Sequence, residues 1–279
     1  ILIILLYWWS QSPVLLIAGG GSARNYIDQY YSVELDKYKK SYYVHMPSSN
    51  AWLLLTEEVI SPQVNPKYYP LCVSSSTAKE EDFLKITTRD NFLKVGSVIE
   101  MLLGYDTLAV FIKNDPSVIQ MLDPDSFTRK DISTDRLADL VTSHNKLNVF
   151  ATSPGSGTRN IYENLLLKKQ IELTDHCFNQ FSEYSDLPSI NKNNLPYLLL
   201  GSKCYVMSDL RGIISSNGAL NLSVYEEIDG EKMYIRKPIN LYFMAYKHDQ
   251  TNTLTIPQIT LDFLKELGCN LGNKVEDNM

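Results

Sequence analysis

Hydrophobic positions recur along the chain as a short apolar run, then small polar residues, then apolar residues at helical spacing. The first apolar run lies at 14–18, and Gly19, Gly20, Gly21 and Ser22 separate it from the helical pattern. A run of this length bounded by glycines or serines is typical of a buried strand, and spacing of three and four residues indicates a helix. Similar units begin with the apolar runs at 42–46, 69–73 and 147–150. The pattern therefore predicts an α/β protein.

Two further runs are strongly β-prone and longer than the others. They lie at 107–114 and 239–246, and a last helix is expected at 256–264. Two long strands that bracket a central segment indicate crossovers between two lobes. We therefore expect lobe 1 to comprise residues 12–105 and 240–279, and lobe 2 to comprise residues 106–239.

The length and charge of the chain narrow the classes of partner. A chain of 279 residues with 44% hydrophobic residues can bury two cores. The formal net charge is −6, and no run of basic residues is longer than two. A nucleic-acid backbone is therefore an unexpected partner. An anionic ligand would have to be bound by local dipoles and a few local charges.

Residues 1–11 begin with the apolar segment Ile-Leu-Ile-Ile-Leu-Leu-Tyr-Trp-Trp. Nine apolar residues are too few to span a bilayer. The segment is interpreted either as the remainder of a signal or anchor segment or as a first buried strand, and we favour the first. That interpretation predicts a periplasmic or extracellular protein, with membrane anchoring at the N-terminus as one option.

The four cysteines, Cys72, Cys177, Cys204 and Cys269, include no C-x-x-C pair, so a zinc site is not expected. An even number of cysteines permits two disulfides in an oxidising compartment, and buried free thiols are equally compatible with it. The sequence leaves their oxidation state open.

Serines or glycines lie at all four strand–helix junctions. A single junction of this kind usually serves as a turn or a helix cap. Open α/β sheets, however, bring the carboxyl ends of their strands to a common crevice. A helix N-terminus offers unpaired N–H donors and a partial positive charge, so several that converge can bind a phosphate-like anion. This reconciles an anionic ligand with the acidic net charge.

Enzyme chemistry has little support in the sequence. The four histidines lie outside the glycine loops, and the chain contains neither a G-x-S-x-G elbow nor a P-loop G-x-x-x-x-G-K-[ST]. The residues Gly19, Gly20 and Gly21 are followed by Arg24, so a G-x-G-x-x-G dinucleotide fingerprint is absent as well. We expect a binding protein without catalytic residues, cofactor or metal.

With its glycine and serine loops taken in order, the sequence resembles the phosphate-binding proteins of bacterial ABC transporters, the PstS type. The strongest element is Gly155-Ser156-Gly157-Thr158-Arg159, which is similar to the family's D-G-S-G-T-R loop. The segments 19–22, 48–49 and 73–76 resemble its other loops in the same order.

The resemblance covers most of the chain and implies a type II periplasmic-binding-protein fold. Such a fold has two α/β lobes, each a mixed sheet flanked by helices, joined by two crossover strands. The resemblance also implies which residues contact the ligand. They are Ser156, Gly157 and Thr158 from lobe 2 and Ser22, Ala23, Arg24, Ser48, Ser49, Ser75 and Ser76 from lobe 1.

The chain departs from the family at two places. Thr152 and Pro154 stand where relatives commonly carry an Arg and an acidic residue, so the usual guanidinium group is missing. We hypothesise that Arg24 supplies the charge instead. Arg159 is a weaker substitute, because a side chain in the first helical turn often points outward.

Ser75 stands where many relatives have an aspartate that accepts the proton of hydrogen phosphate, and this leaves the selectivity among oxyanions open. Asp209 is a candidate replacement. We favour a role for Asp209 as a helix cap or in a surface ion pair with Arg211.

The resemblance predicts a monomeric protein outside the cytoplasm that binds phosphate and delivers it to the membrane permease of an ABC transporter. Two alternatives stay open. The chain is either the sensor domain of a membrane receptor, coupled to a signalling domain, or a binding protein for another oxyanion such as sulfate, molybdate or tungstate.

Overall fold

The computed structural model describes residues 13–31, 41–47, 51–52, 55, 68–76, 96–113, 120, 122, 128–142, 148–171, 181–183, 196–204, 220–247 and 253–268. The segment 1–11, the serines at 48 and 49, Cys177, Asp209 and Cys269 lie outside these residues. The chain divides into two compact units. Unit 1 comprises Ile1–Gly104 and Ile239–Met279, and unit 2 comprises Tyr105–Pro238.

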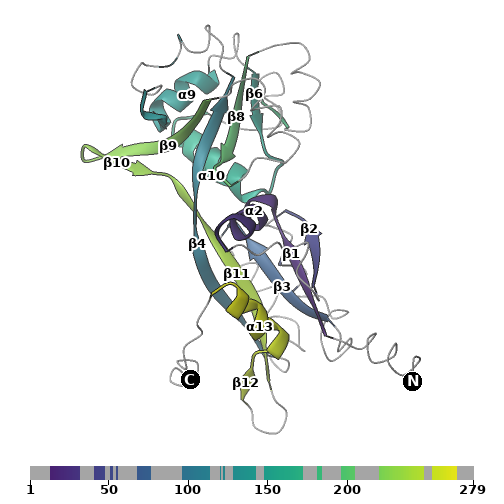
Figure 1. Ribbon diagram of the computed structural model, residues 1–279. Coiled ribbons are helices and arrows are strands. Elements are labelled where there is room, and N and C mark those ends of the chain that lie inside the picture. Colours follow the sequence, from purple (N-terminus) through teal and green to yellow (C-terminus); the bar gives the residue numbers. More distant parts are fainter. Residues whose placement is uncertain are drawn as a thin grey trace. The chain divides into compact units, whose positions relative to one another are not determined.

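Unit 1 is built on a mixed sheet with the strand order β2-β1-β3-β11 (Figure 1). β1 is parallel to β2 and β3, whereas β11 is antiparallel to β3. Its described elements are β1 (Val14–Gly19), α2 (Gly21–Tyr30), β2 (Ser41–His45), β3 (Tyr68–Ser74), β11 (Arg236–Lys247), β12 (Leu254–Thr255) and α13 (Gln258–Glu266).

The apolar alternation of β1 and β3 gives this sheet two buried faces. On one face Leu15, Ile17 and Leu71 pack with Ile27 of α2 and Phe263 of α13. Ala18 and Cys72 belong to a second cluster with Trp52 and Tyr242. Adjacent residues of a strand point to opposite faces, so each run of apolar residues feeds both clusters.

Strand β4 (Gly96–Ile112) is 17 residues long and begins well before the run predicted from the sequence. Ile99, Met101 and Leu103 pack against the cluster around Leu15. Within unit 1, β4 neighbours β11. The prediction missed this half of β4 because Gly104, Tyr105 and Asp106 interrupt the apolar pattern before the run at 107.

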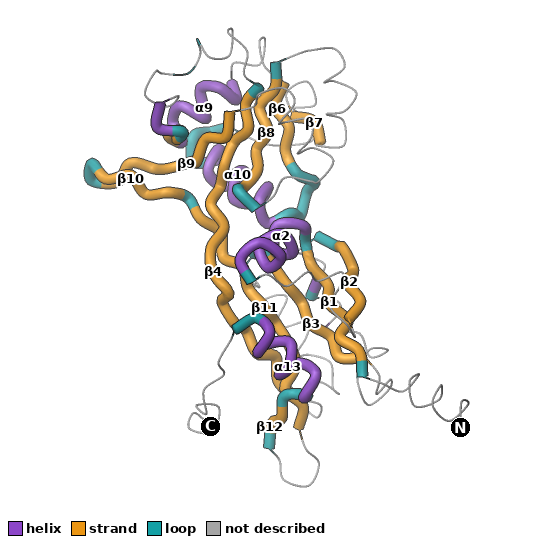
Figure 2. The backbone as a smooth tube through the Cα atoms, viewed as in Figure 1, coloured by secondary structure: helices purple, strands orange, loops and turns teal. Residues whose placement is uncertain are grey.

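Unit 2 has the strand order β9-β4-β8-β6-β7. β6 is parallel to β7 and β8, and β4 is antiparallel to β8 and β9. β9 and β10 form a hairpin closed by Asp229 and Gly230, which have φ angles of 52° and 80° (Figure 2). Its other elements are β5 (Asp131–Ser133), α9 (Thr134–Thr142), β6 (Asn148–Ala151), α10 (Gly157–Leu167), β7 (Phe181–Glu183), β8 (Tyr197–Ser202), β9 (Leu220–Ile228) and β10 (Glu231–Tyr234).

Helix α10 is anchored to this sheet by Tyr162. Its ring is fully buried, and its hydroxyl oxygen lies 3.0 Å from the carbonyl oxygens of both Ala109 in β4 and Gly201 in β8. Burial is the main cause that raises the pKa of Tyr162 well above its usual value, so the hydroxyl keeps its proton as a donor. This contact ties the middle of α10 to β4 and to the carboxyl end of β8.

Within the residues that the structure describes, no helix is long and apolar enough to cross a membrane.

Candidate binding site at the start of helix α10

The loop between β6 and α10 folds as the sequence pattern predicts. Ser156 is the N-cap, and its Oγ accepts a hydrogen bond from the backbone N–H of Arg159 at 3.3 Å. The hydroxyls of Thr152 and Ser156 are 2.7 Å apart. Gly155 has a φ of 80°, which favours glycine. The first turn of α10 therefore carries hydroxyl groups beside backbone N–H groups that lack intrahelical partners.

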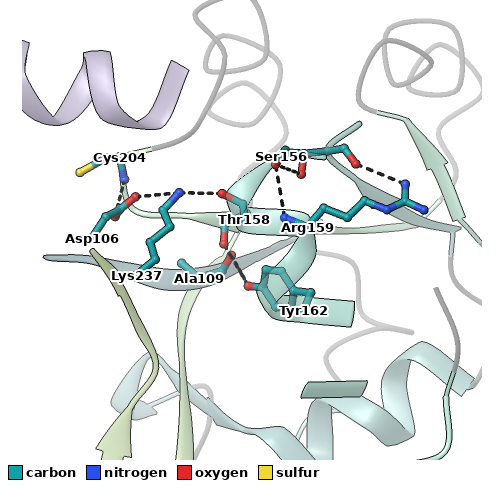
Figure 3. Close-up of polar contacts among 10 residues, drawn as sticks. Asp106, Ala109, Ser156, Thr158, Arg159, Tyr162, Cys204 and Lys237 are labelled. Carbon is teal, nitrogen blue, oxygen red and sulfur yellow. Dashed lines mark hydrogen bonds and ion pairs between the residues drawn. The ribbon is translucent and has the colours of Figure 1, made fainter. Parts of the chain in front are cut away.

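A lysine from β11 reaches the same turn. Lys237 Nζ donates a hydrogen bond of 2.6 Å to Oγ1 of Thr158 (Figure 3). The side chain of Lys237 is fully buried, and Thr158 is 1% exposed. Because an ammonium group only donates, the hydroxyl of Thr158 retains its own hydrogen for another acceptor.

Asp106, in the part of β4 that belongs to unit 2, partly balances the positive charge of Lys237. Its Oδ2 lies 3.4 Å from Lys237 Nζ, and its Oδ1 accepts the N–H of Cys204 at 3.0 Å (Figure 3). Burial lowers the pKa of Lys237 to about 8, and attraction to Asp106 opposes that shift. A buried cation is thus held next to the positive end of a helix.

Arg159 is buried, and the expectation that it points outward is wrong. Its side chain is 7% exposed, with Nε 2.8 Å from Oε1 of Glu163 and Nη1 donating to the carbonyl oxygen of Thr152 at 3.3 Å. The spacing i, i+4 places Glu163 one turn below Arg159 on the same side of the helix. The guanidinium therefore ties the loop to the helix, and its charge is matched by a carboxylate.

The predicted residues near the first glycines lie in α2, because the helix begins at Gly21 with Gly20 as its N-cap. Ser22 and Ala23 are buried in its first turn. Arg24 lies 3.6 Å from Asp28 through Nε, and its guanidinium stands over the ring of Tyr43 at 5.2 Å. Ser22 to Arg24 thus form a helix turn where the sequence predicts a loop. The hypothesis that Arg24 replaces the missing charge stays a prediction.

Ser75 and Ser76 follow β3, as predicted. Ser75 is buried. The hydroxyl of Ser74 is 3.1 Å from that of Ser76 and accepts the N–H of Ser76 at 3.1 Å. Ser74 and Ser76 therefore stabilise this turn through hydrogen bonds to each other. Their predicted contact with a ligand stays a prediction.

Asp106 and Lys237 were not predicted as site residues, although the sequence contains a signal for them. Each stands directly before or within two residues of a long apolar run, at 107–112 and 239–246. Charged residues of opposite sign just before the apolar runs of two neighbouring strands indicate a buried pair. To infer this pair, however, one must know that the two strands belong to one sheet.

Two of the cysteines are described, and both Cys72 and Cys204 are buried free thiols. Burial raises the pKa of Cys72, so this thiol is protonated at neutral pH. Among the described residues there is no group of three His, Cys, Asp or Glu side chains that could hold a metal ion.

No protein-family model matches the chain, and no curated protein sequence matches it either. Solved structures similar to it include PstS from Borrelia burgdorferi, at 13% identity over 95% of this chain and 96% of that chain, with a TM-score of 0.44. CbnR, a LysR family transcriptional regulator, is 8% identical over 95% of this chain and 72% of its own, with a TM-score of 0.47.

Full-length BenM is 11% identical over 95% of this chain and 73% of its own chain, with a TM-score of 0.50. Together with the two units and their strand orders, this similarity identifies the fold. The chain has the two-lobe type II periplasmic-binding-protein fold. The predicted fold class is therefore confirmed: each lobe is a mixed sheet with flanking helices, and β4 and β11 run through both lobes. At this identity the similarity shows the fold alone.

Proposed function

We propose that this chain binds a small inorganic oxyanion, phosphate above all, at the first turn of α10, without catalysing a reaction on it. The observation that carries the proposal is the hydrogen bond from the buried ammonium of Lys237 to Thr158. Two-lobe binding proteins hold small ligands, and the fold supports that broader role.

Electrostatics favour an anion at this position. The N-terminus of a helix carries roughly half a positive charge, and a buried ammonium next to it is repelled unless an anion lies nearby. Asp106 supplies one negative charge, but it lies on the far side of Lys237 from Thr158 (Figure 3). An oxyanion beside Ser156 and Thr158 would be bound by the helix, by two hydroxyls and by this cation.

Asp106 also bears on the choice of anion. Its second oxygen, Oδ2, is ion-paired with Lys237 Nζ at 3.4 Å, so it acts on a ligand through its charge only. A buried carboxylate favours a ligand that carries a proton and repels one that is fully ionised. This supports phosphate over sulfate. The proposed role of the protein is to bind phosphate outside the cytoplasm and to deliver it to the membrane permease of an ABC transporter.

Calorimetric titration of the full chain with phosphate, sulfate and molybdate tests the proposal. We expect saturable binding of phosphate and weaker or undetectable binding of sulfate. Failure to bind any of the three anions would refute the proposed function.

Removing the two hydroxyls of the α10 turn should weaken binding. The double substitution Ser156→Ala and Thr158→Ala deletes two donors to a charged ligand, each contributing about 1.5 kcal/mol or more, so we expect at least a tenfold loss of phosphate affinity. The matched control is Ser223→Ala with Thr142→Ala, which removes a serine hydroxyl of β9 and a threonine hydroxyl of α9. Equal affinities of the two double variants would contradict the site.

The affinity should also depend on pH through Lys237. Its pKa in the folded protein is about 8, below the usual 10.5, so the ammonium is present below pH 8 and is lost above it. Phosphate remains a dianion from pH 8 to 10, and its affinity should therefore fall by up to tenfold per pH unit.

The stability of the protein should show the opposite trend. From pH 8 to 10 the unfolded chain binds more protons at Lys237 than the folded protein does. This group's contribution to the free energy of unfolding therefore rises with pH. Calorimetry and urea unfolding at pH 7, 8, 9 and 10 measure the two opposite trends, and a flat affinity profile would contradict this role of Lys237.

A further inference from the structure

A buried serine hydroxyl in β8 lacks the hydrogen bond that such a group normally requires. Ser202 is fully buried, and within the described residues its Oγ has no partner. Leaving a buried hydroxyl unpaired costs free energy comparable with a lost hydrogen bond, so an orphan of this kind calls for an explanation. The carboxylate of Asp106, on the neighbouring strand β4, is also buried, and its Oδ2 forms an ion pair with Lys237 Nζ at 3.4 Å.

The strand register places these two side chains on one face of the sheet. Leu108 pairs with Ser202 across β4 and β8. Side chains alternate along a strand, so Asp106 and Leu108 share one face, and Ser202 shares it with Leu200. Leu108 and Leu200 pack in the core cluster that contains Tyr162 of α10. Asp106 and Ser202 therefore lie on the face that α10 covers.

The direction of α10 brings Ser202 under the first turn of the helix. β6 and β8 are parallel, and α10 follows β6 in a crossover to the parallel strand β7, so the helix runs back against the strands. Tyr162 touches the carbonyl of Gly201, the residue before Ser202. Thr158 lies one turn earlier in α10, and this turn is displaced toward the carboxyl end of β8. Ser202 is at that end.

Residues shortly before Thr158 lie at the surface of unit 2. Gly155 and Ser156 are partly exposed, whereas Thr158, Lys237 and Ser202 are buried. An anion bound at Ser156 would therefore lie at the boundary between water and the buried ammonium of Lys237. Away from water, a hydrogen bond from a hydroxyl to a charged oxygen contributes more to the binding free energy than it does in water.

We propose that Ser202 is a ligand-contacting residue, whose hydroxyl donates to an oxygen of the oxyanion held at the first turn of α10. This rests on the proposed function and extends it. The anion then lies between the helix and the sheet of unit 2, with Thr158 above it, Ser202 below it and the ammonium of Lys237 beside it. In this arrangement the ligand accepts the hydrogen bond that the Ser202 hydroxyl otherwise lacks.

The variant Ser202→Ala tests this inference by calorimetric titration with inorganic phosphate and by thermal unfolding of the ligand-free protein. We expect phosphate affinity to fall about tenfold, which is the loss of one hydrogen bond to a charged group. We also expect the melting temperature of the free protein to be unchanged or higher, because the variant removes a buried polar atom that had no partner. The control is Ser223→Ala, at a buried serine of β9 in the same unit, which should leave the affinity unchanged.

Three results would overturn the inference. The first is parental phosphate affinity in Ser202→Ala, which would leave the proposed function intact. The second is a lower melting temperature of the free variant, which would assign the hydroxyl a structural partner such as a buried water. The third is an absence of anion binding by the parent chain itself, which would overturn the proposed function as well.

Discussion

Replacing Lys237 by methionine should reduce the affinity for phosphate by about a hundredfold or more. Truncating one partner of a buried, hydrogen-bonded charge pair costs about 2–5 kcal/mol, and the lower half of that range already corresponds to this factor. Methionine keeps most of the volume of the side chain, so the loss reports the ammonium group and not a cavity. Calorimetric titration of parent and variant at pH 7 gives the ratio.

The comparison with Arg24→Ala distinguishes the two candidate sources of positive charge. Arg24 is about one-third exposed and lies near Asp28, whereas Lys237 is fully buried and bonded to Thr158. Screening by water weakens the exposed charge, so we expect Arg24→Ala to lower affinity by less than about fivefold. A large loss of phosphate affinity in Arg24→Ala, with little change in Lys237→Met, would show that Arg24 supplies the positive charge of the site. Circular dichroism of both variants checks that they remain folded.

The fold could be predicted because its signals are local. Glycine or serine after a short apolar run marks the ends of β1, β3 and β6, and the helical pattern after 160 lies inside α10. The long run at 239–246 lies within β11. Such features depend on residues that are neighbours in the sequence, so no knowledge of the tertiary structure is needed to find them.

The chemistry of the site was less predictable because it depends on contacts between distant segments. The G-S-G-T loop identified Ser156 and Thr158, and both stand at the start of α10. The partner of Thr158, however, comes from β11, and the partner of that lysine comes from β4. Neither can be found from spacing alone. The sequence therefore pointed to Arg24 as the source of the missing charge.

Burial was the other quantity that the sequence did not reveal. Arg159 was expected to point to solvent because it is charged and lies in a first helical turn. In the structure its side chain lies along the helix toward Glu163 and returns a hydrogen bond to Thr152. The pair at i, i+4 was visible in the sequence, but a surface ion pair shows the same spacing. Only the position of α10 on its sheet separates the two cases.

Replacing Asp106 by asparagine should destabilise the folded protein by about 3 kcal/mol at pH 7. The change leaves the buried ammonium of Lys237 without its carboxylate, and breaking a buried ion pair by removing one partner is strongly destabilising. Asparagine is nearly isosteric and keeps an oxygen that can accept the N–H of Cys204, so this hydrogen bond and the packing are preserved. Urea unfolding of the ligand-free protein measures the change, with Asp139→Asn in the exposed part of α9 as the control.

The double variant Asp106→Asn with Lys237→Met separates the loss of the pair from any other effect of the substitution. Once the lysine is gone, no charge is left unpaired, and we expect most of the lost stability to return. Raising the pH provides a second check, because a neutral lysine needs no carboxylate. The difference between parent and Asp106→Asn should therefore shrink as the pH rises through about 8, the pKa to which burial lowers Lys237. A destabilisation that persists unchanged to pH 10, and that the second substitution does not relieve, would show that Asp106 acts through its hydrogen bond to Cys204 and not through its charge.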